Sequence, residues 1–176
     1  QIGAFETADV AALGTAALTA LSTSQLQGLG SSQLAALTST QVGALTTAQV
    51  GGLTTLTISR LSTANVQSLT TAQIQALTGS QFDTMSSAQV ATLSTAQVSA
   101  LTTAQVKALT VATLQKLEVA DVAVLGSAQV GALTAAQVRE LTTAQVGALS
   151  TTALPGLSTG AVAAFTSVQA GALSTA

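Results

Sequence analysis

The chain of 176 residues contains no cysteine, histidine, tryptophan or tyrosine. Without cysteine it forms neither disulfides nor thiolate metal sites, and the redox compartment cannot be read from cysteine usage. Without histidine the usual catalytic triad is excluded, so the abundant serines and threonines lack the base that would activate them. We therefore expect a protein that is not an enzyme, with no catalytic residue, no cofactor site and no metal site.

Charge is equally scarce, since only 6% of the residues are charged, against about 25% in a typical soluble domain. The formal net charge is −2, and the four cations are scattered along the chain. A nucleic-acid backbone is bound by clustered lysine and arginine. We therefore expect no nucleic-acid partner.

Long apolar runs are also missing, although 48% of the residues are apolar. Threonine, serine or glutamine interrupts the apolar residues every few positions, and no run approaches the roughly 18 residues of a membrane span. A membrane-spanning protein is therefore not expected, and a membrane-associated array stays as a weaker alternative. The first ten residues contain Glu6 and Asp9 and do not have the pattern of a secretory signal peptide.

What the chain does have is an exact eight-residue repeat. A large apolar residue stands at every eighth position from Phe5 to Leu173, and it is leucine in nineteen of twenty-two cases. A second apolar series lies three residues before the first. Counting Gln1 as position 1, the consensus octad is Gln-Val-x-Ala-Leu-Thr-Thr-Ala, as in residues 97–104. We predict a single array of twenty-two octads over residues 1–176, as a segment of a longer protein.

The octad excludes the simplest regular structures. Eight residues turn an α-helix by about 800°, so each octad of a straight helix would rotate the apolar stripe by about 80°. The period is not that of a coiled coil. Positions 2 and 5 have opposite parity, so a flat strand would direct them to opposite faces. The chain must therefore bend once in every octad.

Position 6 shows where each new element begins. It is serine or threonine in seventeen of the twenty-two octads, and a glutamine usually follows three residues later, as in Thr46 with Gln49. This spacing is typical of the capping box at a helix N-terminus. We predict an all-α solenoid with one very short helix per octad, capped at position 6 and extending from position 7 to position 5. A β-solenoid is the structural alternative.

We further predict about three octads in each coil of the solenoid, so that residues three octads apart stack on neighbouring coils. Two octads per coil would need a full reversal at corners that often lack glycine, such as Leu101-Thr102. Asp83 and Lys107 are separated by three octads and have opposite charges, as do Lys116 and Glu140. Each such exposed pair is worth at most about 1 kcal/mol.

Positions 2 and 5 should form one continuous core. The residues expected to be almost inaccessible to solvent include Val50, Leu53, Val98, Leu101, Val106 and Leu109. Lys107 and Arg139 at position 3 should be exposed. The three phenylalanines, Phe5, Phe82 and Phe165, occupy apolar positions and are interpreted as core residues.

Three kinds of residue could suggest a site, and each has a structural explanation. Glu6 with Asp9 and Glu118 with Asp121 occupy the cap and its partner position, where anions favour a helix N-terminus. The glycines at positions 3 and 4 have no phosphate-loop spacing and should let adjacent coils approach. Pro155, inside a predicted helix, indicates either a local kink at Pro155 and Gly156 or helices of little more than one turn each.

Segments such as Leu101-Thr-Thr-Ala-Gln-Val-Lys-Ala-Leu109 resemble the octapeptide arrays of very large secreted or surface-attached bacterial proteins, including adhesin-like ones. The resemblance implies an extracellular or cell-surface location and a structural role as a stalk, an adhesin spacer or a self-assembling filament. Partners would be the chain itself, by lateral or end-to-end association, or neighbouring segments of a longer chain. The alternative function is a binding module whose regular threonine rows recognise a repetitive ligand such as ice or a glycan.

Overall fold

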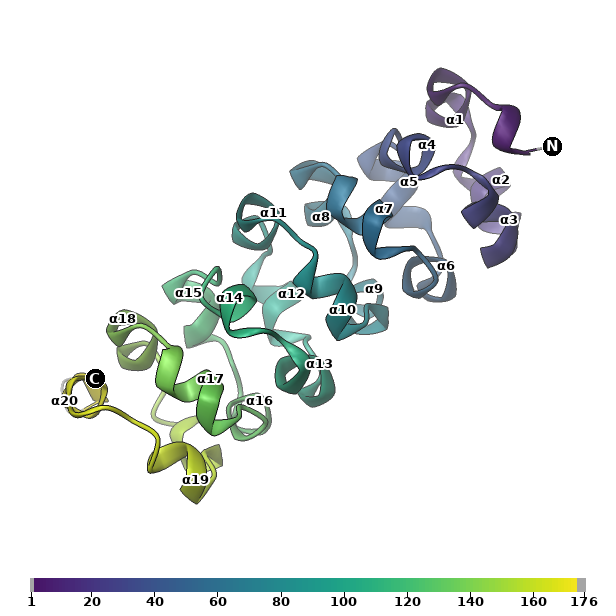
Figure 1. Cartoon of the computed structure of the whole chain (residues 1–176). Helices are drawn as coiled ribbons and strands as arrows, with labels where there is room; N and C mark the ends of the chain where they lie inside the picture. The colour runs from purple at the N-terminus through teal and green to yellow at the C-terminus, as the bar shows by residue number, and fades with distance from the viewer. Residues whose placement is uncertain (1, 174–176) are drawn as a thin grey trace. The chain divides into compact units, whose positions relative to one another are not determined.

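The computed structural model describes residues 2–173 as a succession of short helices (Figure 1). These residues form twenty α-helices of four to seven residues, two 3-10 helices and no strand. The predicted all-α solenoid is therefore confirmed, and the β-solenoid alternative is wrong.

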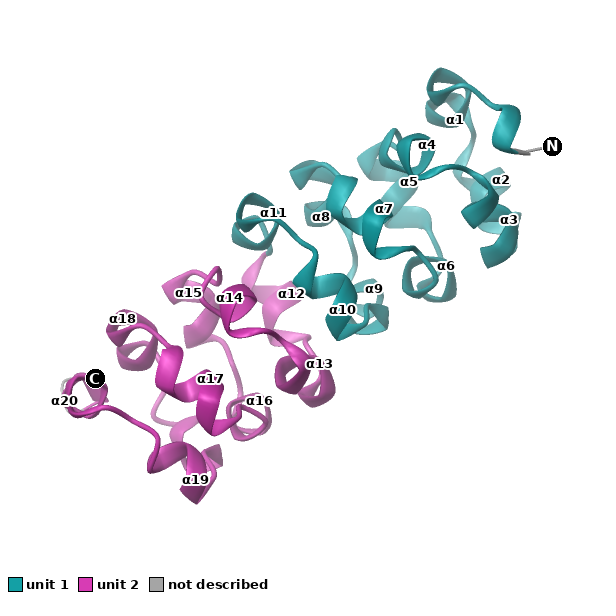
Figure 2. Ribbon diagram, in the orientation of Figure 1, with its two compact units in different colours: residues 1–93 teal, residues 94–176 magenta. Residues whose placement is uncertain are grey.

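The chain divides into two compact units, residues 1–93 and 94–176 (Figure 2). The helices of unit 1 are η1 (Ile2–Ala4), α1 (Thr7–Ala12), α2 (Thr15–Ala20), α3 (Thr23–Gly28), α4 (Ser31–Ala35), α5 (Ser39–Ala44), α6 (Thr47–Gly51), α7 (Thr55–Arg60), α8 (Thr63–Ser68), α9 (Thr71–Ala76), α10 (Gly79–Asp83) and α11 (Ser87–Ala91). The helices of unit 2 are α12 (Thr95–Ser99), α13 (Thr103–Ala108), α14 (Val111–Leu114), α15 (Val119–Ala123), α16 (Ser127–Gly131), α17 (Ala135–Glu140), α18 (Thr143–Gly147), η2 (Leu154–Gly156), α19 (Thr159–Val162) and α20 (Ser167–Leu173). The octad register of the sequence continues across the boundary between the units.

Each α-helix starts as the octad predicts, directly after position 6. At α9, the hydroxyl of Thr70 accepts a hydrogen bond from the Gln73 backbone N–H at 3.2 Å, and the Gln73 Oε1 accepts one from the Thr70 N–H at 2.7 Å. This reciprocal pair satisfies two backbone donors that a helix N-terminus would otherwise leave without partners.

Most helices end earlier than predicted, at position 3 or 4 instead of position 5. The leucine at position 5 is extended, as at Leu45 with φ −57° and ψ 146°, and its N–H donates to the carbonyl of Val42 at 3.2 Å. The extended leucine and the extended cap residue after it make the corner together. No residue within the described part of the chain has a positive φ, so these corners do not depend on glycine.

Within each unit, every helix packs against the helix three octads away. In unit 1 the packed pairs are α1 with α4, α2 with α5, α3 with α6, α4 with α7, α5 with α8, α6 with α9, α7 with α10 and α8 with α11. In unit 2 they are α12 with α15, α13 with α16, α14 with α17, α15 with α18, α16 with η2, α17 with α19 and α18 with α20. The prediction of three octads per coil is confirmed in both units.

The predicted core is confirmed where a coil has neighbours on both sides. Val50 and Val98 have no exposed surface, and Leu101 is 4% exposed, whereas Lys107 and Arg139 are exposed. Small residues at position 3 allow the close approach of neighbouring coils. A Cβ atom on Gly51 would lie 2.9 Å from the Ala76 carbonyl oxygen, and one on Gly131 would lie 2.7 Å from that of Gly156.

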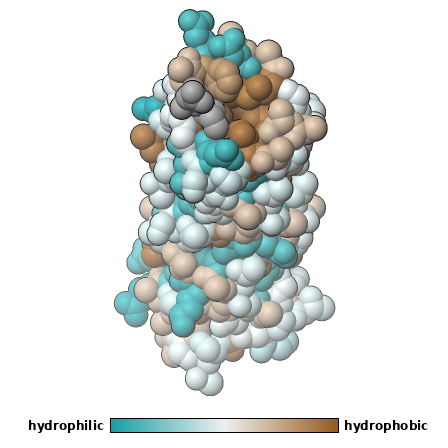
Figure 3. Space-filling model, turned by 90° about the vertical axis from the view of Figure 1, so that its right-hand side faces the viewer, coloured by the Kyte–Doolittle hydropathy of each residue, from teal (hydrophilic) through white to brown (hydrophobic). Residues whose placement is uncertain are grey.

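Burial is lower in the first and last described coils, and here the expected burial is wrong for three residues. Phe82 is buried, but Phe5 is 41% exposed and Phe165 is only half-buried. Val162, at the apolar position 2, is 53% exposed. The reason is that these coils have a described neighbour on one side only. In Figure 3, apolar residues gather near the top of the view, and most of the remaining surface is pale.

The octad that contains Pro155 departs from the others. The helix expected there is replaced by a turn and the 3-10 helix η2, in which the Gly156 N–H donates to the Ala153 carbonyl at 2.9 Å. Proline has no N–H to continue an α-helical ladder. The predicted local irregularity at Pro155 is thus present.

Candidate functional site: a glutamine ladder between coils

The polar residue at position 1 is buried, which sequence reasoning did not predict. Glutamine is usually exposed in globular proteins. Here the buried glutamines are Gln41, Gln49, Gln73, Gln81, Gln89, Gln97, Gln105, Gln129, Gln137, Gln145 and Gln169. They are between 2% and 7% exposed, so their amide groups need partners inside the protein.

Gln73 shows how these partners are provided. Its Oε1 accepts from the Thr70 N–H, and its Nε2 donates to the carbonyl oxygens of Val42 at 3.0 Å and Leu45 at 2.6 Å. Both acceptors belong to the preceding coil. A side-chain amide has one acceptor oxygen and two N–H donors. One glutamine can therefore cap its own helix and also bind a corner of the preceding coil.

The same arrangement recurs at a fixed spacing. The Nε2 donates to carbonyl oxygens 31 and 28 residues earlier, at octad positions 2 and 5, in Gln41, Gln49, Gln73, Gln81, Gln89, Gln129, Gln137, Gln145 and Gln169. We call this series the glutamine ladder. It bonds the backbones of successive coils, whereas the apolar core supplies only non-directional packing.

Gln25 shows that the ladder depends on a preceding coil. It makes both capping hydrogen bonds with Ser22, at 2.9 and 3.2 Å. Its side chain lies in the first described coils and is exposed; its Oε1 accepts from the Ser22 N–H, and its Nε2 donates to no described residue. Gln25 therefore has the capping function without the ladder function.

Some octads have another residue at position 1, and the ladder changes there. Asn65 is shorter by one methylene, and its Nδ2 reaches only the Leu37 carbonyl, at 2.9 Å. Thr57 is buried but pairs with its own cap, Thr54, through an Oγ1–Oγ1 distance of 2.9 Å. Ala161 is buried and has no side-chain donor at all. Successive coils are thus bonded unevenly.

The two carboxylate pairs lie where the cap and its partner were predicted. The Glu6 N–H donates to the Asp9 Oδ2 at 2.9 Å, and the Glu118 N–H donates to the Asp121 Oδ2 at 3.3 Å. Asp9 is exposed, but Asp121 is only 4% exposed. The two aspartates make the same capping bond in different environments.

Burial raises the pKa of Asp121 above its usual value of 3.8. The Glu118 N–H donates to the carboxylate and lowers the pKa, and the negative charge of Glu118 raises it. The loss of hydration outweighs the single hydrogen bond because a buried carboxylate is more stable when it is protonated. Asp121 is thus an electrostatic exception within the ladder.

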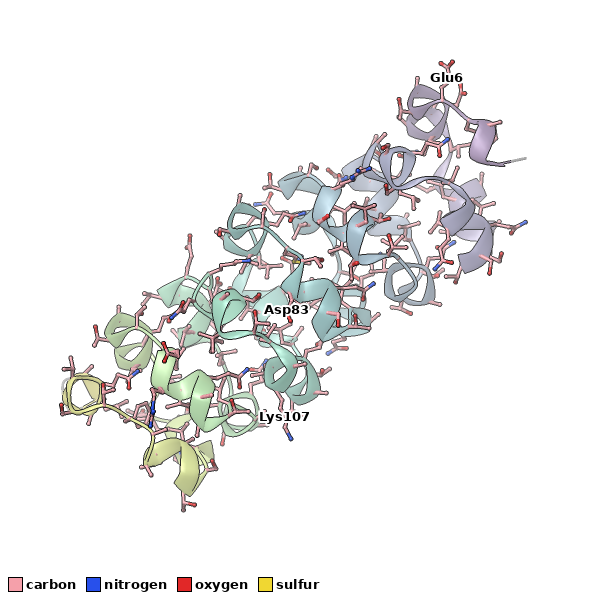
Figure 4. All side chains as sticks on the ribbon, in the orientation of Figure 1. Glu6, Asp83 and Lys107 are labelled. Carbon is pink, nitrogen blue, oxygen red and sulfur yellow. The ribbon has the colours of Figure 1, made fainter. Side chains whose placement is uncertain are left out.

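The remaining charges are spread over the surface. Figure 4 shows Lys107 extending outward from α13, and Glu6 at the end of the chain that contains α1. Over residues 2–173, no three aspartate or glutamate side chains gather closely enough to hold a metal ion. None of the helices described is long and apolar enough to cross a membrane.

Of the two charge pairs expected from the spacing, one lies within a single unit. The Gln115 Nε2 donates to the Glu140 carbonyl at 2.8 Å, which brings residues 115 and 140 together on neighbouring coils of unit 2. This agrees with the stacking of Lys116 near Glu140. The expected approach of Asp83 to Lys107 joins the two units and stays a prediction.

The sequence Ala-Leu-Thr-Thr-Ala-Gln spans one corner of the solenoid, from position 4 of one octad to position 1 of the next. The sequence model of the ALTTAQ repeat matches residues 2–39, 26–55, 80–111 and 114–151. These segments cover well over half of the chain. The chain belongs to the ALTTAQ repeat family. In this ALTTAQ array, the repeat unit named by the family contains the leucine, the cap and the glutamine of the ladder.

No curated protein and no solved structure matches the chain. The description of the family concerns the repeat and nothing else. What is established is therefore a repeat protein built as an α-solenoid, and its role has to be argued from its own residues.

Proposed function

We propose that this ALTTAQ array is a non-enzymatic structural spacer, located at the cell surface or outside the cell, in a stalk, an adhesin or a filament. The observation that carries the proposal is the glutamine ladder. Within each unit, the same amide-to-carbonyl hydrogen bonds recur between neighbouring coils wherever position 1 is a ladder glutamine, so coils add length while they repeat largely the same surface. The polar atoms of the ladder are used inside the protein, and the surface presents mainly threonine, serine, alanine and glycine.

A spacer should grow in proportion to the number of its coils. We expect a duplicated copy of residues 129–152, inserted after Thr152, to add one coil to unit 2. Neighbouring helices pack 8–10 Å apart. Lys107 and Thr159 are both exposed. The distance between nitroxide labels at these two positions, measured by double electron–electron resonance, should therefore increase by about 8–10 Å. An unchanged distance, with the helix content increased, would contradict the spacer.

A second candidate function is the recognition of a repetitive ligand such as ice or a glycan by rows of threonine. Thr47 and Thr71 are exposed and begin the stacked helices α6 and α9. If this function holds, Thr47→Ala with Thr71→Ala should weaken thermal hysteresis or glycan binding and leave the fold intact. Absence of both activities in the unmodified chain would leave the spacer as the better proposal.

A further inference from the structure

One part of unit 2 interrupts the repetitive surface. Position 7 is serine or threonine in eighteen of the twenty-two octads, and the exceptions are Gly79, Val111, Val119 and Ala135. The three apolar exceptions all belong to unit 2 and fall in the segment from α14 to the start of α17. Six of the ten charged residues lie between Lys107 and Glu140. Since identical repeats cannot provide a unique contact, this local departure is where specificity can lie.

A pocket of about 430 Å³ lies in this region, between α14 and α17, and is lined by Val111, Ala135, Ala136, Arg139 and Glu140. Its floor is apolar because valine and alanine replace the hydroxyl residues at position 7. Arg139 is exposed, and no described residue forms an ion pair or a hydrogen bond with its guanidinium group. The pocket thus combines apolar lining residues with two charged ones, Arg139, whose guanidinium has no anionic partner in the described chain, and Glu140.

The neighbouring corner has complementary features. Glu118 is exposed and precedes α15, and Val119, the first residue of α15, is 48% exposed. An exposed valine beside a carboxylate fits a small apolar pocket beside a guanidinium. The pocket lies on α14 and α17, and Val119 begins α15, the helix that follows α14 in the chain. A twofold axis can bring this part of unit 2 in one copy against the same part of another.

We propose that two copies of this chain associate laterally through this surface, with Val119 of each copy in the pocket of the other and Glu118 paired with Arg139. The contact rests on the proposed structural function and names its partner, a second copy. It is small compared with a stable interface, so the association is reversible. It links solenoids side by side at one defined place.

The test is sedimentation equilibrium of the 176-residue chain up to about 1 mM, the range in which weak contacts are populated. The unmodified chain should form dimers. Arg139→Glu and Glu118→Arg should each raise the dissociation constant at least tenfold, and the double variant should restore it to within about threefold by exchanging the charges. Lys107→Glu, on the exposed position 3 of α13, is the matched control and should change nothing.

Val119→Thr and Val111→Thr restore the consensus residue of their octad position, so they should keep the fold, as circular dichroism would show, and still weaken the dimer at least tenfold. A chain that remains monomeric at all concentrations would overturn the proposal. So would a dimer that none of these substitutions affects. Either result leaves the lengthening of unit 2 by an added coil untouched, so the spacer function is tested separately.

Discussion

At the scale of single residues, glutamine at position 1 joins two requirements that usually fall to different side chains. Its oxygen caps its own helix and its nitrogen bonds the preceding coil, so neither can be changed without affecting the other. The amide orientation is fixed by chemistry, because Oε1 faces an N–H donor and Nε2 faces carbonyl oxygens.

Replacement of a ladder glutamine should therefore lower the free energy of unfolding more than replacement of a glutamine that only caps its own helix. Gln73→Ala should lower the free energy of unfolding by about 2–4 kcal/mol, since it deletes the cap and removes the amide donor from the buried carbonyls of Val42 and Leu45, the first of which keeps the Leu45 N–H. Gln25→Ala, where only the cap is lost, should cost about 0.5–1 kcal/mol. Urea denaturation of both variants measures the difference. Equal costs would mean that the ladder contributes nothing to stability.

Asp121 should give the protein a pH-dependent loss of stability. A carboxyl whose pKa is raised by folding binds its proton more tightly in the folded state, so stability falls as pH rises from about 3.8 through the raised pKa of Asp121. Asp121→Asn should remove this loss and be more stable at neutral pH. Asp9→Asn, at the exposed equivalent position, is the control, and thermal melts from pH 3 to 7 compare them. If the melting temperatures of the two variants depend on pH in the same way, Asp121 is not the source of the loss of stability.

The sequence contained a signal for the ladder. A capping box accepts glutamate or glutamine, and the helix dipole favours the anion at this position. Position 1 is nevertheless glutamine in fourteen octads and never glutamate. A requirement for an amide donor explains this preference. The carbonyl groups that accept from this donor could not be predicted, because they are brought to it by the stacking of coils.

At the scale of the helices, the cap and the apolar spacing were sufficient to predict where each one begins and what it buries. They did not predict where each one ends, since the extended leucine at position 5 is imposed by the corner and not by local propensity. Helices of four to seven residues are too short to be stable alone in water. Their stability comes from the neighbouring coils.

A charge in the core should consequently disrupt more than one helix. Leu101, between α12 and α13, is 4% exposed. Leu101→Asp should lower the free energy of unfolding by more than about 3 kcal/mol, because an unpaired carboxylate would be buried. Hydrogen exchange should increase in α12 and α13 and in the helices packed on them, α15 and α16. Thr103→Asp, at the exposed first residue of α13, should leave exchange unchanged. An increase in hydrogen exchange confined to α12 and α13 would show that each coil is stable independently of its neighbours.

At the scale of the whole molecule, the central claim is that each coil contains three octads. The octad period is evident in the sequence, but the number of octads per coil depends on corner angles that no single residue determines. The absence of cysteine offers a direct measurement. A Cβ atom on Gly147 would lie 3.9 Å from the Cβ of Ala172, which belongs to the next coil of unit 2, and this separation is within the usual range for a disulfide.

The chain with Gly147→Cys and Ala172→Cys should therefore form an intramolecular disulfide under mild oxidation, detected as a loss of free thiols in the monomer by mass spectrometry. A comparison pair, Gln115→Cys with Gly147→Cys, is separated by four octads and should keep both thiols. Formation of the disulfide in the first pair alone is the result that three octads per coil predicts. Cross-linking of the second pair in place of the first would contradict it.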